Sequence, residues 1–264
     1  MKKMILGAMF CTGTTLLFGQ QQKNFNDTLS LSPVEVRAIR AGDKAPFTKT
    51  NLSKLELSKA NTGQDLPFLF NQTPSVVINS DAGNGVGYTA MRIRGTDATR
   101  TNITINGIPF NDAESQGAFL VNMPEIISSV SSVQIQRGVG TSSNGTGAFG
   151  ATVSLSTNEY NEKPYGELNN SVGSFNTWKN TVKAGTGLID GHFTVDARLS
   201  RITSDGYIDR ASSNLQSFYF SSAYLNGASS LRLNVFSGKE KTYQAWNGVP
   251  EYLLKDNRTY NSGG

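Results

Sequence analysis

Apolar and polar residues alternate over long runs in the second half of the chain. Every second residue is apolar between residues 193 and 199 and again between 231 and 235. Trp178, Val182 and Ala184 likewise share one side of a segment whose other side is polar. A period of two places successive side chains on opposite faces of a β-strand. From about residue 165 onward, the pattern therefore predicts long antiparallel strands with one apolar face.

Two architectures produce this alternation. Runs of about ten residues separated by Gly, Ser and Asn are typical of a membrane β-barrel, whose outer apolar face meets lipid. A soluble β-sandwich buries the same face under a second sheet and gives the same pattern. The alternation alone does not distinguish these two architectures. With the export signal described below, a membrane barrel and a soluble sandwich are equally supported.

Residues from about 50 to 157 show a mixed pattern. The sequence TGQD at residues 62–65 predicts a capping box that opens a short helix, which ends before Pro74. Residues 124–130 predict one or two helical turns with proline in the first turn. Short strands are expected at residues 75–78, 91–94, 102–105 and 132–136, with turns at Asn106-Gly107 and Arg137-Gly138. This region is therefore expected to mix helices and strands.

The N-terminus has the order of an export signal. Lys2 and Lys3 precede a mostly apolar stretch at residues 4–18, and Gly19 follows. That stretch is shorter than the roughly 20 residues that a membrane-spanning helix needs. No small residue stands directly before Cys11, which argues against lipid attachment. We expect residues 1–20 to be a cleaved signal peptide, with a retained anchor as the alternative.

A polar arm is expected to follow at residues 21–45. Within it, Val34, Val36 and Ala38 alternate with Glu35 and Arg37. Such a segment suits pairing with the edge of another sheet. On these residues alone, a first strand of the next domain is the favoured alternative.

Composition and charge exclude several classes of protein. The chain of 264 residues carries 24 Lys plus Arg against 20 Asp plus Glu, a formal net charge of +4, with no basic run. This balance argues against nucleic-acid binding. One Cys and one His leave no disulfide framework and no structural zinc site. The 27 Gly and the low share of charged residues, 17%, are typical of a β-rich chain with many turns.

No catalytic group or cofactor site emerges from the sequence. The glycine-rich run at residues 138–150 lacks the lysine of a phosphate loop and precedes a strand rather than a helix. His192 lies on a polar strand face with no nucleophile motif near it. We therefore expect no enzyme activity, no cofactor and no metal ligand set.

Five segments of the mixed region together resemble a known family. They are MRIRG at residues 91–95, ITINGIPFND at 103–112, MP at 123–124, SVQIQRGVG at 132–140 and GAFGATVSLST at 147–157. In this order and spacing they are similar to the plug of TonB-dependent outer-membrane receptors. The segment SPVEVRA at residues 32–38 resembles the TonB box, and residues 204–210 and 256–261 resemble the first extracellular-loop region of such receptors.

The resemblance implies an α+β plug domain followed by antiparallel β strands of an incomplete 22-stranded transmembrane barrel. The implied divisions are a signal peptide at 1–20, a periplasmic arm at 21–45, the plug at 46–160 and the first part of the barrel at 161–264. About 100 residues after the plug supply only a few of the strands that a closed barrel needs. The chain is therefore expected to be an N-terminal fragment.

The function implied is energy-coupled import of a scarce nutrient through the outer membrane of a Gram-negative bacterium. Implied partners are TonB with ExbB and ExbD, outer-membrane lipid and a small-molecule chelate. Only about ten residues separate the expected cleavage site from the box, which leaves no room for the extra domain of SusC-type oligosaccharide importers. An iron–siderophore or other metal chelate is therefore the favoured cargo. Cobalamin or glycans are the alternatives, as is a surface adhesin without transport.

The resemblance also implies roles for individual residues. TonB would pair with Ser32, Pro33, Val34, Glu35, Val36, Arg37 and Ala38. Structural and gating roles fall to Arg92, Arg94, Gly95, Asn106, Gly107, Asp112, Arg137, Gly138, Gly147 and Gly150. The three arginines either pair with acidic residues of the barrel lumen or only solubilise the surface. Two loops, 81–88 and 110–119, would face the ligand through Asp81, Asn84, Tyr88, Asn111, Glu114 and Gln116.

Overall fold

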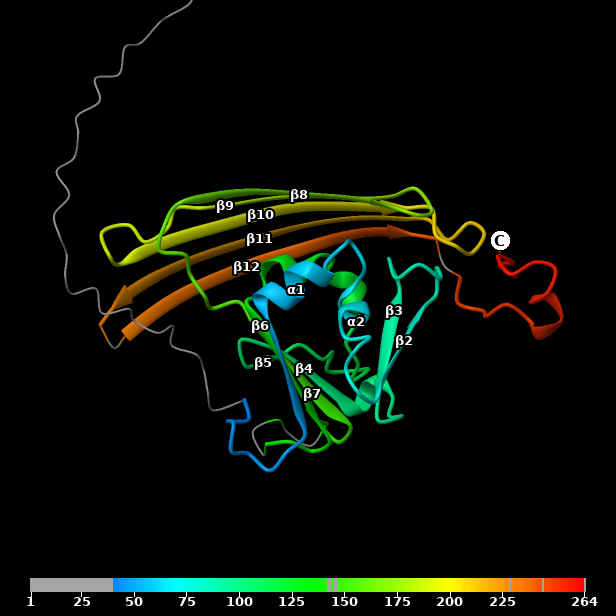
Figure 1. The fold of residues 1–264 in the computed structure, drawn as a ribbon, viewed down its shortest axis with the longest axis horizontal. Helices are drawn as coiled ribbons and strands as arrows, with labels where there is room; N and C mark the ends of the chain where they lie inside the picture. Colours follow the sequence, from blue (N-terminus) through cyan, green and yellow to red (C-terminus); the bar gives the residue numbers. More distant parts are fainter. Residues whose placement is uncertain (1–39, 142–143, 145–146, 228, 244, 264) are drawn as a thin grey trace, which may run out of the picture. The chain divides into compact units, whose positions relative to one another are not determined.

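The computed structural model describes residues 40–141, 144, 147–227, 229–243 and 245–263 (Figure 1). The predicted signal peptide and the segment at residues 32–38 lie outside these ranges. Within them, no helix is long and apolar enough to cross a membrane.

The first sheet has five strands in the order β1-β6-β7-β4-β5. These strands are β1 Lys49–Ser53, β4 Thr101–Ile105, β5 Ile108–Pro109, β6 Ser132–Arg137 and β7 Ala151–Ser156. Strands β4 and β7 are parallel, and the other neighbours are antiparallel. Every residue of β4 and β7 is buried, so both faces of these strands are covered. This sheet is the centre of what we call the mixed domain, residues 40–160.

Short helices and one hairpin complete the mixed domain. They are α1 Lys54–Ala60, α2 Leu66–Leu69, the hairpin strands β2 Val76–Ser80 and β3 Thr89–Ile93, and the 3-10 helices η1 Ala98–Arg100, η2 Leu120–Asn122 and η3 Ile126–Ser129. Their apolar side chains share one core with the sheet, in which Phe70, Ile93 and Ile135 have no exposed surface. The four short strands predicted from the sequence are confirmed, with ends shifted by at most two residues. The helical turns form as well, but Pro124 lies before η3 and not in its first turn as predicted.

The predicted capping box is wrong in its position. It lies at Ser53 and Glu56, where it opens α1, and not at residues 62–65. The Ser53 amide donates to Glu56 Oε2 at 2.8 Å, and the Glu56 amide donates to Ser53 Oγ at 3.4 Å. Asp65 still precedes α2 as its N-cap residue, but its side chain makes no capping bond.

The second half of the chain forms a separate sheet, which we call the long-strand sheet. Its strands are β8 Tyr165–Gly173, β9 Thr177–Gly185, β10 Phe193–Ser204, β11 Ser213–Asn226 and β12 Ser229–Thr242. Neighbours in sequence are neighbours in the sheet, and all pairs are antiparallel (Figure 1). The predicted fold class is confirmed, with the described strands forming an open part of a barrel.

The two faces of the long-strand sheet differ as the alternation predicts. The inner face carries buried polar side chains such as Lys179, Thr181 and Arg198. The outer face carries Trp178, Val182 and Leu199, all of which are exposed. Leu168 and Leu231 on this face are 74% and 76% exposed, and no second sheet covers them in the described part of the chain. An apolar face left open in this way suits a membrane and not a sandwich.

Candidate functional site

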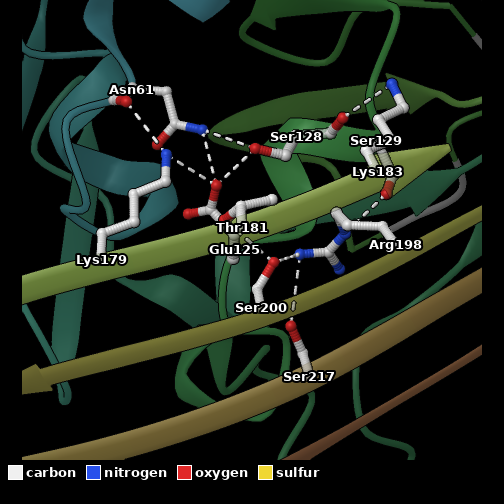
Figure 2. Close-up of polar contacts among 10 residues, drawn as sticks. All are labelled: Asn61, Glu125, Ser128, Ser129, Lys179, Thr181, Lys183, Arg198, Ser200 and Ser217. Atoms are coloured by element: carbon white, nitrogen blue, oxygen red, sulfur yellow. Dashed lines mark hydrogen bonds and ion pairs between the residues drawn. The ribbon is translucent and has the colours of Figure 1, made fainter. Parts of the chain in front are cut away.

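A buried ion pair joins the mixed domain to the inner face of the long-strand sheet. Lys179 Nζ of β9 lies 2.7 Å from Glu125 Oε1, and the two side chains are 0% and 1% exposed. Lys179 Nζ also donates to the carbonyl oxygen of Asn61 at 3.0 Å (Figure 2). A buried charge pair is tolerated only where further hydrogen bonds compensate its loss of water. Lys179 and Glu125 Oε1 meet that condition, whereas Glu125 Oε2 is buried with no hydrogen-bond partner among the described residues.

Local backbone geometry brings the partners of this pair together. Lys179 points inward because it lies one residue from outward-facing Trp178. Glu125 has φ 60, a left-handed conformation, directly before η3. Asn61 follows the last turn of α1, and its Nδ2 donates to Glu125 Oε1 at 3.0 Å and to Ser128 Oγ at 3.0 Å. The Ser128 hydroxyl also donates to Glu125. The end of α1, the helix η3 and the strand β9 therefore each contribute a group that contacts the Glu125 carboxylate.

Two more cations of the inner face bind η3. Arg198 Nε of β10 donates to Ser129 Oγ at 2.9 Å, and its Nη1 donates to Ser200 Oγ at 2.9 Å. Lys183 Nζ donates to the Ser128 carbonyl at 3.2 Å. Figure 2 shows Lys183 beside Ser128 and Arg198 beside Ser129. The contact between the mixed domain and these strands is thus built from hydrogen bonds and charge.

The core of the mixed domain scarcely involves the long-strand sheet. Among the described residues, Tyr219 is the one buried side chain of the long strands in the main apolar cluster. Smaller apolar contacts lie elsewhere, where Val86 packs on Ile202 and Leu215. A domain with its own core and a polar boundary loses little apolar burial when it moves against the sheet. This arrangement suits a domain that is held in place reversibly.

The first predicted ligand loop, residues 81–88, is partly used for packing. Asp81 N donates to the Tyr88 carbonyl at 3.0 Å and closes the loop. Asn84 Nδ2 donates to Ser204 Oγ at 2.6 Å, which fixes this side chain against β10. Tyr88 packs beside the cluster around Val86. Of the three predicted ligand residues in this loop, Asp81 is the one that lines the hollow described next.

That hollow, of about 740 Å³, lies where the loop meets the segments after β10 and β12. Its lining includes Asp81, Gly83, Tyr207, Trp246, Asn247 and Arg258. Burial raises the pKa of the Asp81 carboxyl. Trp246 is 66% exposed, so its indole is free to make contacts. An aromatic ring, a guanidinium and amide groups around one space are suited to a rigid polar ligand.

The second predicted ligand loop, residues 110–119, has a different arrangement. Asn111 Oδ1 accepts from the Ile103 amide at 2.7 Å, and Asn111 Nδ2 donates to the Thr101 and Gln116 carbonyls at 2.9 and 2.8 Å. Asn111 therefore ties the loop to β4. Glu114 and Gln116 are exposed, and neither lines the hollow at Asp81. The structure does not bring the two loops into one site.

Several motif residues have structural roles. Asn106 and Gly107 have positive φ and form the turn between β4 and β5. Asn106 Nδ2 donates to Thr157 Oγ1 and its Oδ1 accepts from the Thr157 amide, both at 2.8 Å. A Cβ at Gly150 would lie 2.0 Å from Thr96 Oγ1, so only glycine fits there. Asp112 accepts from the backbone and side chain of Ser115 and from the Glu114 amide, which lowers the pKa of its carboxyl.

The remaining glycines of the motif are less constrained. A Cβ at Gly138 would lie 2.8 Å from Arg94 Nη1, the mobile end of a long side chain. Gly95 has φ +76, and no atom lies within 4 Å of a Cβ built there or at Gly147. Gly95 and Gly138, at φ +76 and +96, are needed for their backbone conformation.

The three motif arginines contact the mixed domain itself or solvent. Arg137 Nη1 donates to the Pro74 carbonyl at 3.1 Å, and Arg94 Nη2 lies 3.5 Å from Thr48 Oγ1. Arg92 is exposed on β3. Pairing of these arginines with acidic lumen residues stays a prediction. The observed pair between the mixed domain and the long-strand sheet has the opposite polarity, because the carboxylate belongs to the mixed domain.

Asp65 is a buried carboxylic acid near this interface. Thr89 Oγ1 donates to Asp65 Oδ2 at 3.0 Å. Burial raises the pKa of Asp65 to about 8, against the lowering effect of the Thr89 hydrogen bond, and the charges of Glu125 and Glu240 add to the rise. Asp65 is therefore protonated at neutral pH in the folded protein. Within the described ranges, no group of three or more His, Cys, Asp or Glu side chains is placed to hold a metal ion.

The stability of the mixed domain should depend on pH through Asp65. Between pH 4 and 8 the folded state keeps a proton that the unfolded chain releases, so stability falls as pH rises through this window. In Asp65→Asn this loss should disappear, and the variant should be more stable than the parent at pH 9. Urea unfolding of the full-length protein from pH 5 to 9 measures this. The control Asp112→Asn should parallel the parent throughout, and a parallel Asp65→Asn curve would contradict the assignment.

Comparison with known proteins places these features in context. Residues 42–152 match the family model of the TonB-dependent Receptor Plug Domain. The Vitamin B12 transporter BtuB of Vibrio vulnificus (strain YJ016) is 22% identical over 154 residues, which cover 58% of this chain and 24% of that protein. The chain thus spans about a quarter of the curated relative.

Solved structures give the same result for the fold. The siderophore receptor PirA from Acinetobacter baumannii has a TM-score of 0.59 at 17% identity, over 75% of this chain and 32% of PirA. The copper transporter OprC has a TM-score of 0.62 at 16% identity, over 76% of this chain and 31% of OprC. Each alignment covers more residues than the mixed domain contains. The structural similarity therefore includes part of the long-strand sheet.

Proposed function

We propose that this chain, whose residues 42–152 match the plug domain of TonB-dependent receptors, belongs to a receptor that imports a scarce nutrient across the outer membrane, driven through TonB. The plug domain is the mixed domain described above. The observation that carries the proposal is its boundary with the long-strand sheet. The plug has its own core and is held by the Glu125–Lys179 pair and by hydrogen bonds from Arg198 and Lys183. Contacts of this kind exchange for water at a small net cost when the domain moves.

The outer face of the long-strand sheet supports a membrane location. Exposed apolar side chains recur along all five strands, and Leu168, Leu199 and Leu231 are examples. Exposure of a continuous apolar surface to water is unfavourable, whereas contact with lipid tails removes that surface from water. We therefore assign these strands to the wall of an outer-membrane barrel that surrounds the plug.

The energy supply in this proposal enters at residues 32–38. The segment alternates apolar and charged side chains, which suits strand addition to TonB. ExbB and ExbD complete the proposed energising machinery. The contacts of Arg40, the first residue that the structure describes, indicate where a pull on this segment would act. Arg40 Nη1 donates to Ser132 Oγ at 2.9 Å and Arg40 Nη2 to the Ser154 carbonyl at 2.9 Å, so force would reach β6 and β7.

The hollow at Asp81 is the proposed cargo site, and the proposed cargo is an iron–siderophore complex or another metal chelate. Tyr207 and Trp246 offer aromatic faces, and Arg258 supplies a positive charge. Metal chelates often combine aromatic or amide groups with negative charge, and such groups are bound by stacking and by guanidinium contacts. The relatives named above transport vitamin B12 and copper or bind a siderophore, so the choice of chelate rests on this hollow.

Growth on defined nutrients tests the function. Disruption of the intact gene should impair growth on one class of ferric chelate as the sole iron source and leave growth on other nutrients unchanged. The full-length double variant Trp246→Ala with Arg258→Gln should reproduce the defect through weaker binding of that chelate. Glu114→Gln, in the loop away from the hollow, is the matched control. A growth defect on cobalamin alone or on a glycan alone would identify that nutrient as the cargo in place of a ferric chelate. Unchanged growth on every nutrient would contradict the import function.

A further inference from the structure

The outer face of the long-strand sheet carries one row that is entirely polar. Antiparallel register places Asn180 of β9 opposite Arg201 of β10, Arg201 opposite Gln216 of β11, and Gln216 opposite Lys239 of β12. Asn170 of β8 extends the same row. Two of these five side chains are cations, and both are exposed. The row runs across all five strands.

The next row on the same face is apolar on β8 to β11 and ends in Ser237 on β12. It contains Val182, Leu199 and Phe218, again placed side by side by the strand register. A hollow of about 480 Å³ spans the two rows, with these three side chains on one part of its lining and Arg201 and Lys239 on the other. The sheet surface therefore changes from apolar to cationic within a single hollow.

Charge is segregated between the two faces of the sheet. The carboxylates of the five strands, Glu167, Asp196 and Glu240, all lie at inner-face positions, because each is an odd number of residues from an outward neighbour on its strand. The outer face has Arg201 and Lys239, and Lys241 one row further along. The outer face of these strands thus carries positive charge with no carboxylate to balance it.

The polar row lies at the height of a membrane interface. From Phe193, at the far end of the apolar rows, to Arg201 are eight residues along β10. At about 3.3 Å per residue and a strand tilt near 40°, this is roughly 20 Å along the membrane normal, close to the height of a barrel's apolar band. Trp178, whose indole Nε1 donates to Asn176 Oδ1 at 2.8 Å, lies one row beyond. Tryptophan in such a position is typical of the membrane–water boundary.

We propose that this hollow binds a phosphorylated lipid of the surrounding leaflet, with an acyl chain on Val182, Leu199 and Phe218 and the phosphate on Arg201 and Lys239. The proposal rests on the membrane location given above for these strands. Arg201 and Lys239 lie two strands apart, about 10 Å at the backbone, and both side chains are long enough to reach one headgroup between them. Charge-assisted hydrogen bonds to phosphate favour such a pair, and Gln216 between them offers a further amide donor.

Lipid retention by the purified full-length receptor tests this site. Native mass spectrometry would count lipids that stay bound after incubation with diphosphoryl lipid A or with the same lipid stripped of phosphate. The parent should retain the phosphorylated form preferentially. Arg201→Gln with Lys239→Gln should lower that retention about tenfold, which is the loss of one charge-assisted contact or more. The control, Lys44→Gln with Lys163→Gln, removes two exposed cations elsewhere and should retain the lipid like the parent.

A charge-preserving exchange, Arg201→Lys with Lys239→Arg, keeps the proposal falsifiable if the neutral variant does not fold. The variant with both charges preserved should retain the phosphorylated lipid like the parent. If this variant loses the lipid, the positive charges are not what binds it. Equal retention of both lipid forms, or competition by millimolar inorganic phosphate alone, would also overturn the proposal. A receptor that is not recovered in the membrane fraction contradicts the proposed function instead. Transport with unselective lipid binding contradicts only the lipid site.

Discussion

Deletion of residues 32–38 from the full-length protein should abolish uptake and leave cargo binding intact. The proposed energy supply acts only through this segment, whereas the hollow at Asp81 is built from residues well beyond it. Uptake of a radiolabelled ferric chelate by whole cells should fall to the level of a strain without the gene. Binding of the same chelate by outer-membrane vesicles should keep its affinity within about twofold, since no binding contact is removed.

The controls for this deletion separate loss of coupling from loss of folding. Deletion of residues 22–28 removes a segment of equal length from the same polar arm and should leave uptake unchanged. Receptor abundance in the outer membrane should be equal in both deletion strains. Uptake that survives deletion of 32–38 in cells with working TonB would refute the transport proposal and leave a surface-binding protein or adhesin as the alternative.

The described residues suggest where coupling force would act first. Besides the Arg40 contacts, the Ala41 amide donates to Gln134 Oε1 at 2.7 Å, and Gln134 Nε2 donates to the Ala41 carbonyl at 3.1 Å. Residues 40 and 41 are thereby fastened beside β6, in the central sheet of the plug. The pull would therefore load β6 and β7 before it loads β1, the edge strand, which pairs with β6 alone.

Local patterns predicted the secondary structure well where a period or a turn residue dominates. The long strands follow from strict alternation, because one face meets the plug and the other remains open. The turn at Asn106-Gly107 follows from two residues that tolerate positive φ. Helix α1 was missed because Leu57 is its one buried residue, so it has almost no apolar stripe. Its capping box, Ser53 with Glu56, was the available signal.

The site was harder to predict because it depends on contacts between distant segments. Glu125 and Lys179 are 54 positions apart, and neither stands out in a motif of its own. Lys179 does lie on the polar side of an alternating strand, which was a usable signal for an inward cation. The hollow near Asp81 needs Tyr207 and Trp246, from segments more than 120 positions further along the chain. Asn111 was expected to face ligand, but an asparagine in a turn commonly bonds nearby backbone, as this one does.

Replacement of Lys179 by methionine should destabilise the plug against the barrel by about 3–5 kcal/mol. The substitution leaves Glu125 buried with its charge uncompensated, and removal of one partner from a buried pair costs about this much. Asn61 and Ser128 still donate to the carboxylate, so the loss should fall at the lower end of that range. Urea-induced release of the plug in the full-length protein, followed by protease sensitivity of the plug, measures the change.

A double-mutant cycle distinguishes the ion pair from a packing effect. Glu125→Gln combined with Lys179→Met removes both charges and should recover most of the stability lost in Lys179→Met alone. Lys183→Met is the matched control on the same strand face, since Lys183 has a backbone carbonyl as its partner in place of a carboxylate. Its cost should stay below about 2 kcal/mol. If the double variant is as unstable as the sum of the single variants, the two charges are not coupled, and the ion pair is not what holds the plug.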